Sequence, residues 1–133
     1  MGAVVADTHA IIWYLLNSTN LSTNAMAALD KAATDGAPVY IASITLVEVV
    51  YLVEKGRLPD VALEQLNSAL TDSDSGLMVV PLDLAVVQAM MEIPRDVVPD
   101  MPDRIIAATA RYLSLPLVTR DSKIQAADIE TIW

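Results

Sequence analysis

Four acidic residues of this sequence stand at points where a folded chain could gather them around a metal ion. Asp7 directly follows an apolar run at residues 3–6, and Asp121 follows another that ends at Thr119. Glu48 and Asp103 lie in predicted helices, Asp103 in a first turn, where the partial positive charge of the helix N-terminus favours a carboxylate. Ligands bind beyond the carboxyl ends of strands in open α/β sheets, so we expect these four side chains to meet at one edge of a sheet.

Glu48 is the most informative of the four because its helical neighbours are apolar. Ile44, Val49 and Leu52 surround it at helical spacing. Burying an unpaired carboxylate costs several kcal/mol, so such a side chain is normally protonated, paired with a cation or bound to a metal ion. An ion pair with a nearby arginine such as Arg104 is the alternative that the sequence leaves open.

The available ligand types indicate which metal ion the acids would hold. The chain has no Cys and a single His, so the candidate ligands are carboxylate oxygens, which suit Mg²⁺ or Mn²⁺ better than zinc. A lone histidine such as His9 more often packs or forms a hydrogen bond, and we place it outside the predicted metal site. Taken singly, Asp7 and Asp121 could cap the helices that follow them, and Asp103 could stabilise its own helix. Their joint placement favours the metal site.

A second group of residues carries weaker indications. Ser43 and Thr119 lie at strand ends and could bind a phosphate oxygen or water, although an N-cap role is the simpler interpretation of Ser43. Arg104 is a further candidate for substrate binding. Trp13 could stack on a base, as could Tyr14, but aromatic residues on an early amphipathic helix usually belong to the core or to a dimer interface. Core filling is the simplest interpretation of four methionines, with an interface role second: Met78, Met90, Met91 and Met101.

Alternating strands and helices must position these residues. Short apolar runs at 3–6, 39–42, 77–80 and 117–118 predict strands buried on both faces, as in parallel sheets, and a weaker strand is expected near 129–132. Helices are predicted to begin at Ser22, Ser43, the Pro59–Asp60 pair, Asp83 and Asp100. The expected fold is an α/β three-layer sandwich with a mostly parallel sheet, in one domain over residues 1–133.

The overall charge is the main objection to a nucleic-acid partner. Seventeen acidic and eight basic residues give a formal net charge of −9, which repels a polyanion. Bound divalent ions would offset part of it, and five basic residues lie in the last third of the chain: Arg95, Arg104, Arg111, Arg120 and Lys123. With no recognisable secretory signal and no apolar run approaching the ~20 residues of a membrane span, a cytoplasmic protein is expected.

Four segments together resemble a known family. In chain order they are Val4-Val5-Ala6-Asp7-Thr8-His9-Ala10, Ser43 through Glu48, Asp103-Arg104-Ile105-Ile106-Ala107-Ala108-Thr109-Ala110, and Leu117-Val118-Thr119-Arg120-Asp121. The chain thus resembles a PIN-domain ribonuclease of the VapC toxin type over nearly its whole length. The last two segments form a fairly specific pair, whereas the opening Asp-Thr-His is weak alone. The chain departs from the family in having no Phe, and Ile124 stands where a Phe is frequent.

The resemblance implies a function, a cofactor and partners. It implies an endoribonuclease that depends on Mg²⁺ or Mn²⁺, is inhibited by a small cognate antitoxin of the VapB type, and forms homodimers and higher toxin–antitoxin assemblies. Asp7, Glu48, Asp103 and Asp121 would be its catalytic and metal-binding acids, with Thr119 as an assisting hydroxyl. Metal-activated water would hydrolyse the RNA phosphodiester and leave a 5′-phosphate and a 3′-hydroxyl.

Three other interpretations compete with the ribonuclease. A phospho-receiver module needs adjacent acids after an early strand and a lysine after a late one, but Asp7 is followed by Thr8-His9 and the late strand ends in Thr119-Arg120. An Asp-x-Asp phosphatase fails because position 9 is His. The strongest rival is a PIN-like protein that binds its partner but cleaves RNA weakly or not at all, which the net charge favours.

Overall fold

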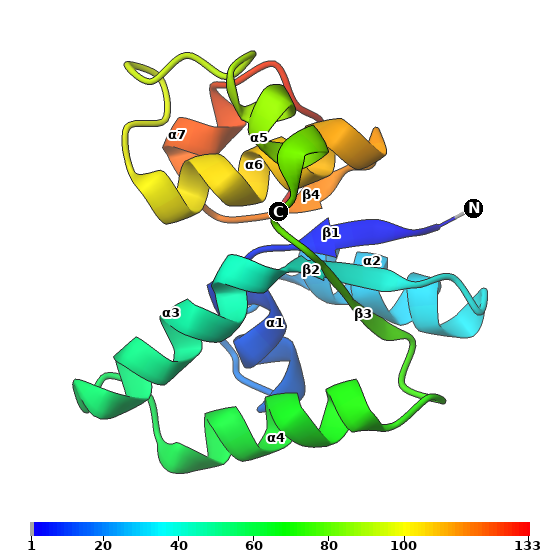
Figure 1. The fold of residues 1–133 in the computed structure, drawn as a ribbon. Helices are drawn as coiled ribbons and strands as arrows, with labels where there is room; N and C mark the ends of the chain where they lie inside the picture. The colour runs from blue at the N-terminus through cyan, green and yellow to red at the C-terminus, as the bar shows by residue number, and fades with distance from the viewer. Residues whose placement is uncertain (1) are drawn as a thin grey trace.

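A five-stranded parallel sheet forms the centre of the computed structural model, which describes residues 2–133 (Figure 1). Its strands are β1 (Val4–Ala6), β2 (Val39–Ala42), β3 (Leu77–Val80), β4 (Leu117–Val118) and β5 (Thr131–Ile132). Their order across the sheet is β3-β2-β1-β4-β5, and every neighbouring pair is parallel. The strands follow the predicted apolar runs, and the predicted parallel sheet is confirmed.

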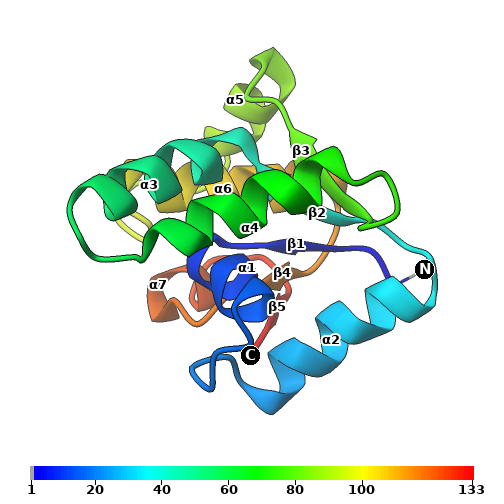
Figure 2. The ribbon, with the colours of Figure 1, turned by 90° about the horizontal axis from the view of Figure 1, so that it is seen from below.

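Helices cover both faces of the sheet. They are α1 (Thr8–Leu15), α2 (Thr23–Thr34), α3 (Ser43–Glu54), α4 (Asp60–Thr71), α5 (Leu84–Met90), α6 (Met101–Leu113) and α7 (Ser122–Gln125). In Figure 1, α1, α2 and α4 lie below the sheet and α5, α6 and α7 above it. Helix α3 contacts both α4 and α6, as Figure 2 also shows. The predicted three-layer α/β architecture is therefore confirmed.

Most helices begin at the polar residue that the sequence indicates, but Ser43 plays another part. The side chains of Ser22, Asp83 and Asp100 each accept a hydrogen bond from a backbone N–H in the first turn of α2, α5 and α6. Ala42 is the N-cap of α3, so the N-cap prediction for Ser43 is wrong. The Ser43 hydroxyl instead accepts a hydrogen bond from the Leu82 N–H at 3.2 Å. This hydrogen bond links α3 to the segment between β3 and α5.

The edge of the sheet differs from the prediction of strands buried on both faces. Strand β3 pairs only with β2, and on it Met78 is 52% exposed and Val79 37% exposed. Met91 and Met101 are also exposed, at 75% and 62%, so core filling is wrong for three of the four methionines. Periodicity alone does not distinguish an edge strand from a central one, because exposure depends on which elements cover it.

The strand order creates a crevice beside β1. From β1 the chain moves outward to β2 and β3, and it then crosses to the other side of β1 to form β4. Strand order reverses next to β1, and in open α/β sheets this topological switch point is where ligands bind, beyond the carboxyl ends of the strands. Asp7 follows β1 and Asp121 follows β4 after two residues, so both lie at this crevice.

Candidate active site

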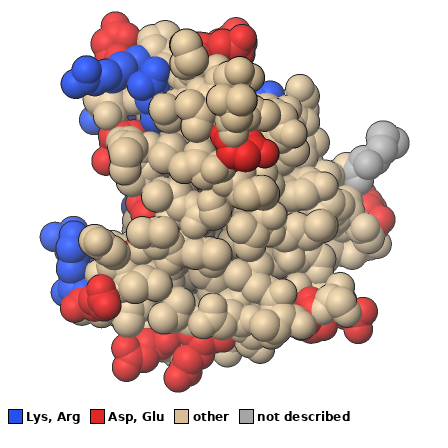
Figure 3. Space-filling view, in the orientation of Figure 1, with Lys and Arg blue, Asp and Glu red and all other residues tan. Residues whose placement is uncertain are grey.

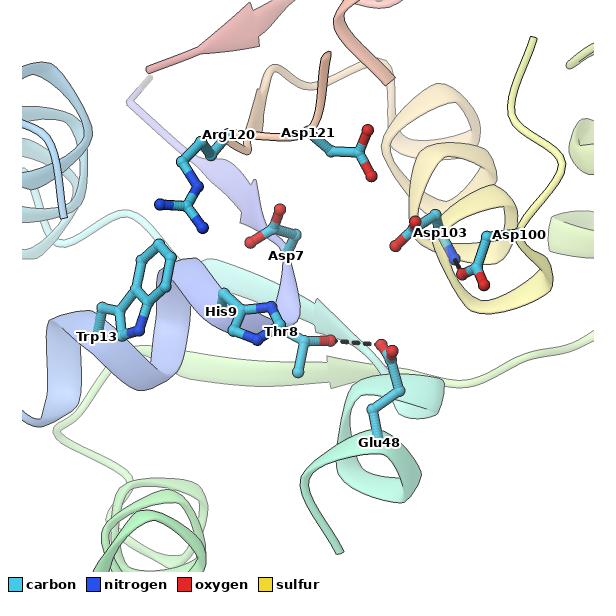
Figure 4. Close-up of a pocket in the computed structure, with 9 residues that line it drawn as sticks. All are labelled: Asp7, Thr8, His9, Trp13, Glu48, Asp100, Asp103, Arg120 and Asp121. Atoms are coloured by element: carbon cyan, nitrogen blue, oxygen red, sulfur yellow. Dashed lines mark hydrogen bonds between the residues drawn. The ribbon is translucent and has the colours of Figure 1, made fainter. Parts of the chain in front are cut away.

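An acidic pocket of about 340 Å³ opens at the crevice and brings the four predicted acids together (Figure 4). Asp7 comes from the end of β1, Glu48 from α3, Asp103 from the first turn of α6 and Asp121 from the start of α7. Nine residues line this acidic pocket: Asp7, Thr8, His9, Trp13, Glu48, Asp100, Asp103, Arg120 and Asp121. Segments from opposite ends of the chain, one at Asp7 and another at Asp121, thus converge, as the strand-end argument predicts.

Asp7 and Asp121 are held by helix caps. The Oδ1 of Asp7 accepts a hydrogen bond from the Ala10 N–H at 2.8 Å, and the Oδ1 of Asp121 accepts one from the Lys123 N–H at 2.8 Å. The backbone N–H of Asp121 in turn donates to the Thr119 hydroxyl at 3.0 Å. Capping and metal binding are compatible roles, because each cap occupies one carboxylate oxygen and the second oxygen is a separate donor atom.

Glu48 is held by a threonine rather than by an arginine. The Thr8 hydroxyl donates to Glu48 Oε1 at 2.6 Å and lies 3.1 Å from the hydroxyl of buried Thr45. Arg104 points elsewhere, since its Nε donates to the carbonyl oxygen of Ile93 at 3.0 Å. No ion pair involves Glu48 within residues 2–133, so the alternative of a Glu48–Arg104 pair is wrong.

Burial and mutual repulsion make the charged forms of these carboxylates unfavourable. Desolvation is the main cause that raises the pKa of both Asp7 and Glu48 above the ordinary range. For Asp7, the Thr119 hydroxyl, the Ala10 N–H and His9 oppose this rise in pKa, and Asp121 adds to it. For Glu48, Thr8 and His9 oppose the rise in pKa, whereas Asp100 and Asp7 increase it.

Asp103 is the most perturbed acid of the pocket. Burial is the largest cause that raises the pKa of Asp103 from 3.8 to about 8, and the neighbouring carboxyl of Asp121 and the charges of Asp100 and Glu48 raise it further. Figure 4 shows the side chains of Asp103 and Asp121 directed toward the same space. The charged carboxylates of the pocket repel one another, so binding a proton or a cation there is favourable.

The donor set suits a hard divalent cation. It consists of oxygen ligands, no ion pair within residues 2–133 neutralises the carboxylates that line the pocket, and a cation would remove their repulsion. In the part of the chain that the structure describes, no three acidic or histidine side chains already stand close enough to enclose one metal ion. The carboxylates would therefore have to rotate inward as a cation binds.

The weaker substrate-binding candidates fare differently. Ser43 and Arg104 do not line the acidic pocket, because the Ser43 hydroxyl is bound to Leu82 and the Arg104 guanidinium to Ile93. We therefore withdraw Ser43 and Arg104 as substrate-binding residues. Thr119 is fully buried, and its hydroxyl accepts a hydrogen bond from the Asp121 N–H and lowers the pKa of Asp7. It acts on the acids rather than on a ligand directly.

Several pocket residues were missed or set aside on sequence evidence. Asp100 caps α6, and its side chain also lines the pocket beside Asp103. Trp13 lines the pocket on α1, and the Arg120 guanidinium lies over its ring at 4.6 Å from the centroid. The available signal was proximity in the sequence, because Trp13 lies on the helix that directly follows Asp7, and Arg120 immediately precedes Asp121.

Comparison with known proteins agrees with this geometry. A family model described as PIN domain matches residues 4–130. No curated protein matches the chain. None of the helices in residues 2–133 is long and apolar enough to span a membrane.

Solved structures of toxin–antitoxin complexes are similar in fold. VapBC2 from Rickettsia felis, bound to a promoter DNA fragment, has a TM-score of 0.72 and 17% identity over 97% of this chain and 96% of that chain. A toxin–antitoxin complex from Klebsiella pneumoniae has a TM-score of 0.64 and 22% identity, covering 98% and 96%. FitAcB from Neisseria gonorrhoeae has a TM-score of 0.62 and 25% identity, covering 96% and 95%.

Proposed function

Because this chain belongs to the PIN domain family, whose members are generally nucleases, we propose that it is an endoribonuclease that depends on Mg²⁺ or Mn²⁺. We include in the proposal that residues 1–133 form one domain, acting in the cytoplasm as the toxin of a toxin–antitoxin pair. The observation that carries it is the convergence of Asp7, Glu48, Asp103 and Asp121 on one pocket at the topological switch point.

The residues of the pocket have distinct parts in the proposed reaction. A divalent cation held by the four acids would activate the attacking water and neutralise charge that develops on the scissile phosphate. The Thr8 hydroxyl donates a hydrogen bond to Glu48, and the Thr119 hydroxyl accepts one from the Asp121 N–H and lowers the pKa of Asp7. These hydroxyls therefore help to position the acids. Since water attacks instead of the ribose 2′-hydroxyl, the products would carry a 5′-phosphate and a 3′-hydroxyl.

A second groove supports the proposed antitoxin partner. It has a volume of about 350 Å³, shares Glu48 with the acidic pocket, and is lined by exposed apolar side chains, among them Val47, Tyr51 and Met101. An extended apolar segment of a small antitoxin would bury these side chains and end beside Glu48, which would account for the proposed inhibition. The similar solved structures are complexes with antitoxins, which favours this occupant.

The proposed homodimer would use a different surface. Much of the face that carries β3 and α5 is free of charged side chains (Figure 3), and Met78, Leu84 and Met91 are exposed there. Exposed apolar side chains that gather on one face favour contact with another protein surface. A second copy of the chain is the partner that we propose for it.

One observation favours a second candidate function, a partner-binding PIN protein with little nuclease activity. Five carboxylates and one arginine line the pocket, and the chain carries a formal charge of −9, so approach of RNA is opposed electrostatically. In this alternative the apolar groove beside Glu48 would be the functional surface, and the acids would be a remnant of catalysis.

Cleavage of RNA by the wild type separates the two candidates. We expect the protein to cut a mixed single-stranded RNA pool in Mg²⁺ or Mn²⁺, to leave 5′-phosphate ends, and to stop cutting when EDTA is added. DNA of the same sequences serves as the matched substrate, and sequencing gels with end-group analysis give the readout. A well-folded protein that leaves RNA intact in both metals, or that cuts equally well in EDTA, would contradict the proposed function.

A further inference from the structure

Arg120 is the one Arg or Lys side chain that lines the acidic pocket within the described residues, where His9 is the other basic group. It immediately precedes Asp121, so the connection from β4 to α7 carries a cation and a carboxylate side by side. Any polyanion that enters this pocket meets five carboxylates, the His9 imidazole and this one guanidinium. The position of Arg120 therefore decides where a negatively charged ligand can be attracted.

The guanidinium of Arg120 is held by an aromatic ring instead of by an acid. It lies over the ring of Trp13 at 4.6 Å from the centroid, and Trp13 itself contacts the rings of His9 and Trp133 at 5.3 and 6.0 Å. Although carboxylates line the same pocket, no ion pair and no hydrogen bond of the Arg120 side chain is formed within residues 2–133. The ring thus positions the cation and leaves its N–H groups free of protein acceptors.

A guanidinium that lies over an aromatic ring and has free N–H groups suits a phosphate ligand. Arginine presents five donors in a planar fork that matches phosphate oxygens. Its contact with the Trp13 ring limits the conformations of the free side chain, so less conformational entropy is lost when a phosphate binds. Figure 4 shows Arg120 and Trp13 together on one side of Asp7, with Asp103 and Asp121 on the other sides of the pocket. A phosphate bound by Arg120 would therefore lie beside the carboxylates, not among them.

We infer that Arg120, positioned by Trp13, binds the RNA phosphate that neighbours the scissile one. This inference rests on the proposed ribonuclease function and adds a substrate anchor to it. The attraction between Arg120 and one phosphate offsets part of the repulsion between the RNA and the carboxylates of the pocket. An acidic protein can therefore still bind an RNA strand beside these carboxylates. Arg120 would contact the substrate directly, and Trp13 would be a positioning residue.

The salt dependence of RNA binding tests this anchor. The probe is a fluorescein-labelled 12-nucleotide single-stranded RNA of mixed sequence, bound in Mg²⁺ by proteins that all carry Asp7→Asn to limit cleavage. Arg120→Gln is expected to weaken binding roughly tenfold and to reduce the slope of log K against log salt by about 0.7, the value for one single-strand phosphate contact. Arg95→Gln is the matched control, because Arg95 is exposed, does not line the pocket and loses the same charge.

Neutral methylphosphonate groups placed one at a time in the RNA locate the contact. At one position the substitution should weaken binding of the Arg120-containing protein and leave binding of the Arg120→Gln protein unchanged. Trp13→Leu should weaken binding about two- to fivefold with the salt slope retained, and Trp13→Phe should restore most of the affinity. In steady-state cleavage without the Asp7 change, Arg120→Gln should raise KM while kcat stays within about threefold.

Two results would overturn the inference while RNA binding by the parent protein still supports the proposed function. One is an equal salt slope for the parent protein and its Arg120→Gln variant, and the other is the absence of any methylphosphonate position that distinguishes the two. Failure of both the parent protein and the wild type to bind the RNA would overturn both the inference and the proposed function. The two failures are therefore distinguishable in one titration series.

Discussion

Asp7→Asn and Glu48→Gln will each lower the rate of RNA cleavage by about 10²–10⁴-fold at saturating Mg²⁺ or Mn²⁺. Each substitution keeps the size of the side chain but removes a negative charge from the proposed metal ligands, and a metal ion contributes several kcal/mol to such reactions. Asn can still accept the Ala10 N–H that caps α1, so the fold should survive. Initial rates on a labelled RNA, with circular dichroism to verify folding, provide the measurement.

Two acids outside the pocket provide matched controls for this experiment. Glu54→Gln removes the same charge from the same helix, α3, at an exposed position. Asp83→Asn alters another helix N-cap, one that accepts the Val86 N–H. Both controls should retain cleavage within about threefold. Rates that fall equally in controls and pocket variants, or pocket variants with wild-type rates, would remove these acids from the reaction.

Asp103→Asn will stabilise the metal-free protein at alkaline pH. The Asp103 carboxyl has an ordinary pKa of 3.8, which applies to the unfolded chain, but in the folded protein its pKa is about 8. Between these values the folded state binds the additional proton, so the free energy of unfolding falls as pH rises from about 4 to about 8. Because the carboxyl is only half-buried, solvent screening leaves a gain of ~1–2 kcal/mol for the variant at pH 8.

Thermal unfolding in EDTA at pH 4 and pH 8 measures this effect. The melting temperature of Asp103→Asn should exceed that of the wild type by about 3–8 °C at pH 8 and by much less at pH 4. Millimolar Mn²⁺ should raise the melting temperature of the wild type more than that of the variant, because metal binding relieves the same repulsion. Parallel pH profiles for the two proteins would show that Asp103 is not under electrostatic strain.

Local patterns in the sequence predicted most of the secondary structure. Ser22, Asp83 and Asp100 mark the helix starts because their side-chain oxygens satisfy backbone N–H groups that every helix leaves free. The runs at Val39–Ala42 and Leu77–Val80 coincide with β2 and β3 because apolar, β-branched segments of this length favour strands. These features depend on neighbours in sequence, which is why the sequence alone predicts them.

Features that depend on tertiary contacts were harder to predict. The exposure of Met78 follows from the edge position of β3, which no local pattern specifies. The hydroxyl of Ser43 accepts a hydrogen bond from the N–H of Leu82, 39 residues away, and the Arg104 guanidinium donates one to the Ile93 carbonyl. The hydrogen-bond partner of each polar group is brought close only by folding. A position at a strand or helix end therefore predicted the wrong role for each side chain.

The candidate site shows the same division. Convergence of Asp7, Glu48, Asp103 and Asp121 was predictable because strand ends of a parallel sheet share an edge. Asp100, Trp13 and Arg120 were not assigned to the site, because a cap, an amphipathic-helix aromatic and a basic residue each have a simpler structural explanation. Only the folded arrangement brings the Arg120–Trp13 stack to the rim of the acids.

The position of a bound metal ion tests the central claim most directly. Crystals soaked in Mn²⁺ and measured near the manganese absorption edge would locate the ion by anomalous scattering. The account predicts a peak in the acidic pocket, with carboxylate oxygens of at least two of Asp7, Glu48, Asp103 and Asp121 as ligands. A pocket without a manganese peak at a metal concentration that supports RNA cleavage, or a peak confined to another site, would contradict it.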